Sequence, residues 1–213
     1  MPVVTKSLAG AMCAGFLLVA GAASARAEGQ DIGAVDKVQN SVLAEQDDRQ
    51  RTLADGSPVY FQDLLRSGAD ARLQATLIDK TQITLGENAV LRIDEFVYEP
   101  GPRGGSLALE VVQGAFLFVG GEVEKPHGGA VSIDTPVGTL GIRGTTVWGG
   151  PLDGRYGVIV LDGEVTVSNA GGTVTLTKGM GTMVDGAATA PEAPAPWAED
   201  RMGRAVATIS FGR

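Results

Sequence analysis

Residues 133–147 constrain the fold of this chain more than any other stretch. Pro136 lacks an N–H group and favours an extended conformation at Thr135, so this pair ends a strand or lies on a sheet edge. Gly138, Gly141 and Gly144 then recur every three residues, a spacing typical of a chain that makes successive tight bends. The stretch therefore predicts two short strands joined by a bend.

Much of the remaining chain has the alternation of half-buried strands. Ala71, Leu73, Ala75 and Leu77 share one parity, with polar residues between them. Residues 115–119 and 158–161 are instead apolar at both parities, which predicts strands covered on both faces. Before residue 196 no long segment shows the apolar spacing of a helix. The fold class is therefore predicted to be all-β.

The stretch at 133–147 closely resembles the signature of FecR domains of the bacterial cell envelope, and the resemblance extends over roughly residues 56–181. It is carried by residues 77–88, by residues 158–167, and by the signature residues Thr135, Pro136, Gly138, Gly141, Arg143, Gly144 and Thr145. The resemblance implies a β-solenoid-like stack of short strands, with a β-sandwich or an open barrel as the structural alternative. It assigns these signature residues a structural role.

FecR proteins proper are regulators, in which a cytoplasmic segment restrains a sigma factor and the periplasmic domain meets an outer-membrane transporter. This chain has only a few residues before an apolar segment at its N-terminus. The resemblance therefore implies the exported β domain without the anti-sigma segment.

Residues 1–27 have the pattern of a signal peptide. Lys6 is followed by an apolar and small-residue run at 8–23, and residues 23–27 fit an A-x-A cleavage site. A retained membrane anchor is the alternative, but the many alanines and glycines lower the hydrophobicity that a span requires. Cys13 lies inside this run as an ordinary signal residue. The mature chain is expected to begin near Glu28, in the periplasm or outside the cell, with no membrane span.

Removal of the signal peptide would leave no cysteine, which excludes disulfides and thiolate metal sites. The whole chain has a net charge of −8. Without Lys6 and Arg26, 15 basic residues would face 25 acidic ones. This balance argues against nucleic acid and anionic membrane surfaces as partners.

No catalytic, cofactor or metal site is expected. His127, the only histidine, could be combined with Ser132 and Asp134 as a triad, but no nucleophile elbow accompanies them. Paired carboxylates of a glycan-active enzyme could occur among the acidic residues Asp94, Glu95 and Glu99, although a solvated acidic surface is the commoner explanation.

Arg143 is the one charged residue of the signature, and we expect it to act as a corner clamp. Its guanidinium could bridge backbone carbonyls or pair with Asp162 or Glu164. A ligand contact is the alternative.

Aromatic residues are the candidates for a partner surface. Trp148 and Tyr156 flank a glycine-rich loop, and Trp197 lies in the C-terminal tail. Amphipathic rings often anchor contacts with proteins or sugars. The alternative is that the rings at the loop cap the end of the core.

The last part of the chain changes character after residue 186. The domain is expected to cover residues 28–186, followed by a Pro/Ala linker at 187–196 and a tail at 197–213. Pro196, Glu199 and Asp200 resemble a helix start, whereas the alternation of Ala207, Ile209 and Phe211 favours a strand.

Together these patterns predict a non-enzymatic, exported module for binding, sensing or scaffolding through protein–protein contacts. Its partner would be another envelope protein. Two other functions remain open: a carbohydrate-active β-solenoid enzyme with paired carboxylates, and a structural protein that self-associates through sheet edges.

Overall fold

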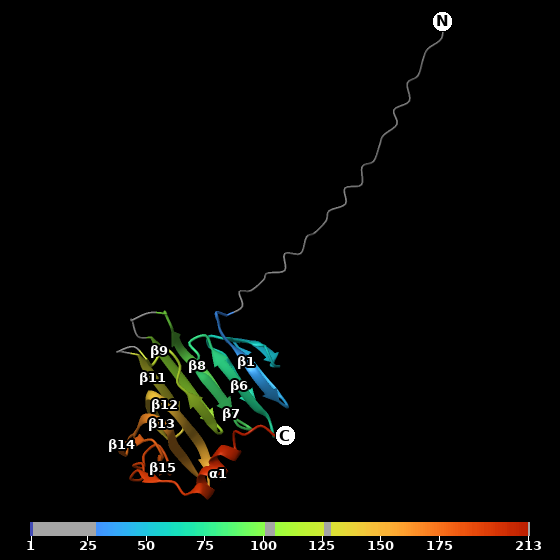
Figure 1. The fold of residues 1–213 in the computed structure, drawn as a ribbon. Helices are drawn as coiled ribbons and strands as arrows, with labels where there is room; N and C mark the ends of the chain where they lie inside the picture. The colour runs from blue at the N-terminus through green and yellow to red at the C-terminus, as the bar shows by residue number, and fades with distance from the viewer. Residues whose placement is uncertain (2–28, 101–104, 126–128, 213) are drawn as a thin grey trace.

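A computed structural model describes Met1 and residues 29–100, 105–125 and 129–212 of the chain. The described residues fold as an all-β domain with one short helix (Figure 1), so the predicted fold class is confirmed. The signal-peptide prediction lies outside the described residues. None of the described residues belongs to a helix with the length and apolarity needed to cross a membrane.

Sixteen strands and one helix follow one another in the described part of the chain. In order, they are β1 Asp31–Gln39, β2 Val42–Gln46, β3 Arg49–Thr52, β4 Pro58–Tyr60, β5 Leu64–Ser67, β6 Arg72–Leu77, β7 Gln82–Leu85, β8 Val90–Val97, β9 Ser106–Gln113, β10 Phe116–Val119, β11 Ala130–Thr135, β12 Gly138–Leu152, β13 Arg155–Asn169, β14 Gly172–Thr177, β15 Met180–Val184, β16 Ala195–Pro196 and α1 Glu199–Ala207.

The strands pair side by side along one curled sheet. Its main path runs β3-β2-β5-β8-β9-β11-β12-β10-β7-β6-β1-β4, and β13 extends it through pairs with β12, β14 and β15. All these pairs are antiparallel except that of β9 with β11. The coils of a β-solenoid are not confirmed. The open-barrel alternative describes the curl better, because each strand hydrogen-bonds to its neighbours around the curve.

The hairpin of β12 and β13 joins two arms of this sheet. Residues 138–142 of β12 pair with β11, and residues 146–149 pair with β10. The first arm contains residues 138–143, residues 164–169 of β13, β14, and the strands from β11 to β3. The second arm contains residues 146–152, residues 155–160, β15, β16, and the strands from β10 to β4. Each half of the hairpin therefore belongs to a different arm.

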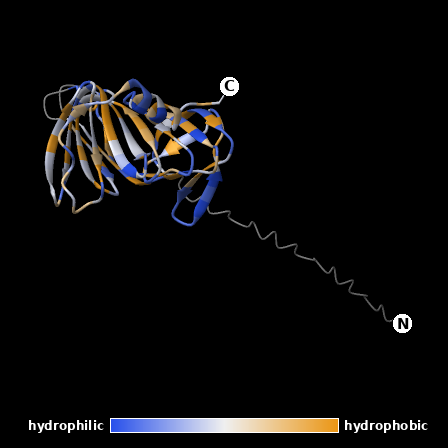
Figure 2. Ribbon diagram, turned by 90° about the horizontal axis from the view of Figure 1, so that it is seen from below, coloured by the Kyte–Doolittle hydropathy of each residue, from blue (hydrophilic) through white to orange (hydrophobic). Residues whose placement is uncertain are grey.

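The core lies between the two arms. Apolar residues from both form one buried cluster, such as Leu109 and Ile133 of the first arm and Phe118 and Val158 of the second. Hydrophobic and hydrophilic residues alternate along many strands (Figure 2), as the sequence pattern predicts. In the second arm, β10 and residues 158–161 also bury apolar side chains on the opposite face. These strands are thus apolar at both parities because both of their faces are covered, as the sequence pattern predicts.

The C-terminal segment covers the outer face of the second arm. Trp197 packs edge-to-face on Trp148, with ring centroids 6.0 Å apart. Gly157 and Gly181 make room for the Trp197 ring, since a Cβ at either would lie within 3 Å of it. The indole N–H of Trp148 donates to the Thr208 hydroxyl just after α1, at 3.1 Å. The tail is therefore a helix docked on the domain.

The prediction that three aromatic residues form a partner surface is wrong. Trp148, Tyr156 and Trp197 are only 1, 7 and 7% exposed. Both tryptophans fill the cluster under α1, and Tyr156 lies in the core between the arms, where burial raises its pKa. The alternative of core capping is the arrangement observed for Trp148 and Tyr156.

Residues 187–196 lie against the sheet. The side-chain amide of Asn169 donates to the carbonyls of Gly186 and Thr189, and the Thr182 hydroxyl donates to the carbonyl of Glu192 at 2.8 Å. These contacts hold the segment between β15 and α1 against the sheet.

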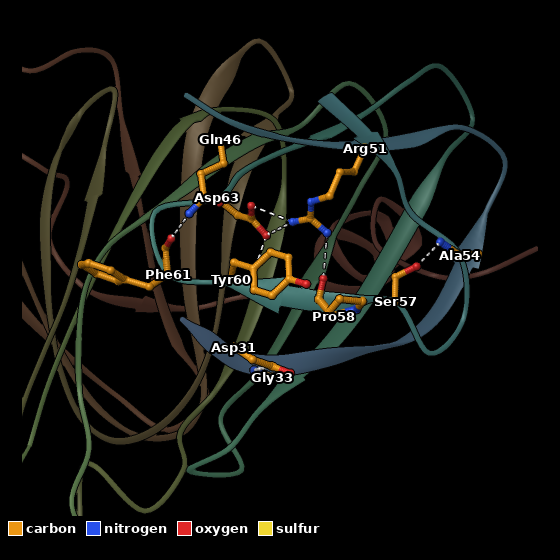
Figure 3. A network of polar contacts seen from close by, with 10 residues as sticks. All are labelled: Asp31, Gly33, Gln46, Arg51, Ala54, Ser57, Pro58, Tyr60, Phe61 and Asp63. Carbon is orange, nitrogen blue, oxygen red and sulfur yellow. Dashed lines mark hydrogen bonds and ion pairs between the residues drawn. The ribbon is translucent and has the colours of Figure 1, made fainter. Parts of the chain in front are cut away.

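A buried ion pair fastens the β2–β3 hairpin to the start of β5 (Figure 3). Asp63 is fully buried and accepts hydrogen bonds from Arg51 at 2.6 and 2.8 Å and from the backbone N–H of Tyr60 at 2.8 Å. Arg51 also donates to the carbonyl of Pro58 and lies 4.4 Å from the Tyr60 ring centroid. This network satisfies a buried carboxylate that would otherwise destabilise the fold.

We predict that Trp197→Ala lowers the free energy of unfolding by about 3–5 kcal/mol, because it empties a buried aromatic site. The control is Val206→Ala in α1, since Val206 is 39% exposed and its truncation should cost less than about 0.5 kcal/mol. Chemical denaturation of both variants measures the difference. Equal losses would contradict the tight docking of this segment.

Candidate functional site

The signature begins with a tight turn between β11 and β12. The Thr135 hydroxyl donates to the carbonyl of Gly138 at 2.6 Å and accepts a hydrogen bond from the N–H of Val137. Pro136 is exposed at the tip of the turn, where its missing N–H costs nothing. Thr135 is the last residue of β11, so the predicted strand end is observed here.

The next part of the signature is the corner at which the β12–β13 hairpin passes from one arm to the other. The pairing register shifts between Arg143 and Thr146. Gly144 and Gly163 lie opposite each other with φ values of +59° and +83°. A Cβ on Gly163 would lie 2.1 Å from the carbonyl oxygen of Gly144. The two backbones approach too closely here for any side chain at Gly163.

Thr145 holds this corner from inside. Its side chain is buried, and its hydroxyl lies 2.7 Å from the carbonyl oxygen of Arg143 and 2.9 Å from that of Glu164. The same hydroxyl accepts a hydrogen bond from the N–H of Arg143. The backbone N–H of Thr145 donates to the Glu124 carboxylate at 3.1 Å. One threonine thus links both strands of the hairpin to the loop before β11.

The predicted clamp role of Arg143 is wrong. Its side chain is exposed, and among the described residues its guanidinium makes no hydrogen bond or ion pair. Asp162 pairs instead with Lys178 at 3.0 Å, and Glu164 is opposite Arg143 in register without an ion pair. The reason is strand alternation, which buries Ile142 and turns Arg143 outward.

Arg143 instead lines an open groove on the outer face of the first arm. The groove has a volume of about 800 Å³. Its floor is formed by Ser132 of β11, Gly141 of β12 and Thr166 of β13, which lie side by side in register. Gly141 keeps the centre open, because a Cβ there would have no neighbour closer than 3.9 Å. We call this hollow the signature groove.

Charged residues of both signs border the signature groove. They are Glu124, Lys125, Arg143 and Glu164. Burial raises the pKa of Glu124, while hydrogen bonds from the backbone of Thr145 and Gly144 oppose that shift. One oxygen of the Glu124 carboxylate is buried without a hydrogen-bond partner among the described residues. The groove can therefore offer hydroxyls, a guanidinium, an ammonium and carboxylates to a polar ligand.

The acidic residues considered for glycan cleavage lie elsewhere. Asp94 and Glu95 are exposed on β8, and Glu99 is exposed beyond its end. Glu95 accepts a hydrogen bond from the Ser106 hydroxyl, and Asp94 borders a smaller hollow of about 360 Å³. Within the described part of the chain no three His, Cys, Asp or Glu side chains are grouped as a metal would require. His127 lies outside the described residues.

Sequence reasoning missed three carboxylates that organise the domain: Asp63, Asp79 and Glu124. Asp79 is fully buried and accepts hydrogen bonds from the backbone N–H of Thr81 at 3.0 Å and from its hydroxyl at 2.7 Å. An aspartate two residues before a threonine is a recognisable turn signal, so Asp79 could have been found. No local signal marks the ion pair of Asp63 with Arg51 or the contact of Glu124 with Thr145, because these partners lie 12 and 21 residues away.

We predict opposite outcomes for the two side chains at the corner. Arg143→Ala should change the free energy of unfolding by less than about 0.5 kcal/mol, because the side chain is exposed and unpaired. The nearly isosteric Thr145→Val should lower it by about 1–3 kcal/mol, because buried backbone groups lose their partner. Chemical denaturation of both variants measures these changes. A larger loss of unfolding free energy for Arg143→Ala than for Thr145→Val would support the clamp role of Arg143.

Comparison with known proteins agrees with this signature. Residues 63–166 match the family described as FecR protein. Two crystal structures of a candidate anti-sigma factor from Parabacteroides distasonis ATCC 8503 have similar folds, with a TM-score of 0.52 and 15% sequence identity. The similarity covers 66% of this chain but only 62% of that protein, less than two thirds of its length. No curated protein sequence matches this chain. The match covers just under half of this chain and supports the resemblance of its signature to FecR domains.

Proposed function

We propose that this chain is an exported signalling or sensing module that binds another protein of the bacterial cell envelope and catalyses no reaction. The FecR match supports a place in signalling, since FecR proteins proper are regulators. The related fold of a candidate anti-sigma factor agrees with that place. The leader-like residues 1–27 support export to the periplasm or beyond.

The observation that carries the binding proposal is the signature groove. It is lined by residues next to the corner that carries the FecR resemblance, and it lies on the outer face of the first arm, which α1 does not cover. Its small floor residues and its mixed charges suit an extended polar segment of a partner protein better than a flat apolar surface. The Arg143 guanidinium, which makes no hydrogen bond or ion pair within the described domain, is then available to a partner carboxylate.

We predict that a photo-crosslinking amino acid at Gly141 forms one discrete adduct with a second envelope protein in living cells. The same probe at Asp48, exposed in the β2–β3 turn, is the control and should form none. Arg143→Glu, combined with the probe at Gly141, should reduce the adduct at least about tenfold if a carboxylate pairs there. Fusion of the full chain to alkaline phosphatase, which is active only after export, tests the compartment.

Equal adducts at both probe positions would contradict binding at the groove, as would the absence of any adduct at Gly141. An adduct that contains only this chain would also count against the proposal. An inactive phosphatase fusion would contradict export.

A further inference from the structure

Among the described strands, four lie at an end of the sheet, because each pairs with a single neighbour. They are β3, β4, β14 and β16, which pair only with β2, β1, β13 and β15. Natural proteins protect such strands with charges or prolines, since unpaired N–H and C=O groups attract other strands. Arg49 protects β3, and prolines Pro58 and Pro196 stand in β4 and β16. β14 has neither.

The sequence of β14 is Gly172-Thr173-Val174-Thr175-Leu176-Thr177, with no charge and no proline. Strand alternation turns the three threonines outward, where all are exposed, and turns Leu176 into the core. Val174, on the core side, is only partly buried. β14 is therefore an uncharged edge strand, and its core-facing Val174 is only partly covered.

The direction in which the N–H and C=O groups of β14 point follows from a hydrogen bond at the corner. The carbonyl of Glu164 faces β12, since it lies against the Thr145 hydroxyl. Backbone groups alternate in direction along an antiparallel strand. Glu164 is opposite Thr177, and Thr166 is opposite Thr175. Thr173, Thr175 and Thr177 consequently direct their N–H and C=O groups away from β13, toward a side on which no described strand pairs with β14.

This edge is complementary to itself. A two-fold axis at Thr175 places that residue opposite the same residue of a second copy, and it places Thr173 opposite the second copy's Thr177. All three outward pairs then exchange hydrogen bonds, and threonine pairs across strands are favourable. Val174 faces the second copy's Leu176 on the core side. No like charges meet, although the chain as a whole has a net charge of −8.

We propose that two copies of this chain join through antiparallel pairing of β14, which merges their first arms into one continuous sheet. A contact of this kind is isologous, so it closes at the dimer and does not propagate. Because paired strands keep the same face outward, the dimer presents its two signature grooves on one side. The dimer itself does not depend on what the grooves bind.

The experiment is sedimentation equilibrium of the full-length chain at concentrations up to about 0.5 mM, because a contact between two short strands is small and weak. The wild-type chain should form dimers. Thr175→Lys should raise the dimer dissociation constant at least about tenfold, because two lysines meet on the axis. The matched control is Thr52→Lys on β3, another exposed threonine at a sheet end, which should leave dimerisation unchanged.

A charge-reversal mixture makes the test specific. Thr175→Glu alone should dissociate like Thr175→Lys, whereas an equimolar mixture of the two should restore dimers. Far-UV circular dichroism and the melting temperature establish that each variant is folded. A wild-type chain that stays monomeric, a Thr175→Lys variant that dimerises normally, or a mixture that stays dissociated would overturn the proposal. Thr175 is opposite the floor residue Thr166, but dimerisation is measured on the purified chain without a partner protein, so this failure is distinct from failure of the crosslinking experiment.

Discussion

The close approach of Gly144 and Gly163 determines the shape of this domain. At this point the β12–β13 hairpin leaves the first arm and enters the second, and a Cβ on Gly163 would lie 2.1 Å from the carbonyl oxygen of Gly144. Positive φ values at both residues make the bend, and the Thr145 hydroxyl ties the two strands together beside it. Without this corner the hairpin would continue in one direction, and the arms could not face each other across a shared core.

The two arms differ in what covers their outer faces. In the second arm this face is apolar, and Trp197 and α1 seal it. In the first arm it is polar, with small residues beside charged ones such as Arg92 and Glu110, and it stays open, which leaves the signature groove and the edge of β14 accessible. The stabilising cover of α1 and the proposed recognition sites thus lie on different surfaces of one sheet. The corner that closes the core also places Arg143 at the border of the groove.

The parts of the structure that depend on local pattern could be predicted from the sequence. Alternation along residues 71–77 gives the buried face of β6, and apolar residues at both parities mark strands covered on both sides. The turn at Thr135 and Pro136 follows from the restrictions that proline imposes on the backbone. These features need only the residues in the strand itself.

The parts that depend on distant partners could not be predicted. The apolar neighbours of Arg143 predict a clamp, yet strand alternation turns its side chain outward, and Thr145 and Glu124, 21 residues apart, hold the corner instead. The sequence leaves open whether the two tryptophans bind a partner or pack on the domain, because it does not show that the tail returns over the second arm, where Trp148 and Trp197 meet. The choice between stacked coils and a curled sheet likewise depends on long-range pairing.

The most direct test of the corner is a comparison of Gly163→Ala with Gly179→Ala by chemical denaturation. The two glycines have φ values of +83° and +80°, but a Cβ at Gly179 would meet nothing within 4 Å. Gly179→Ala should cost about 1–2 kcal/mol from backbone conformation alone. Gly163→Ala should cost at least about 3 kcal/mol more or prevent folding, because the strands must separate. Equal losses for the two variants would contradict the claim that close approach at this corner sets the fold.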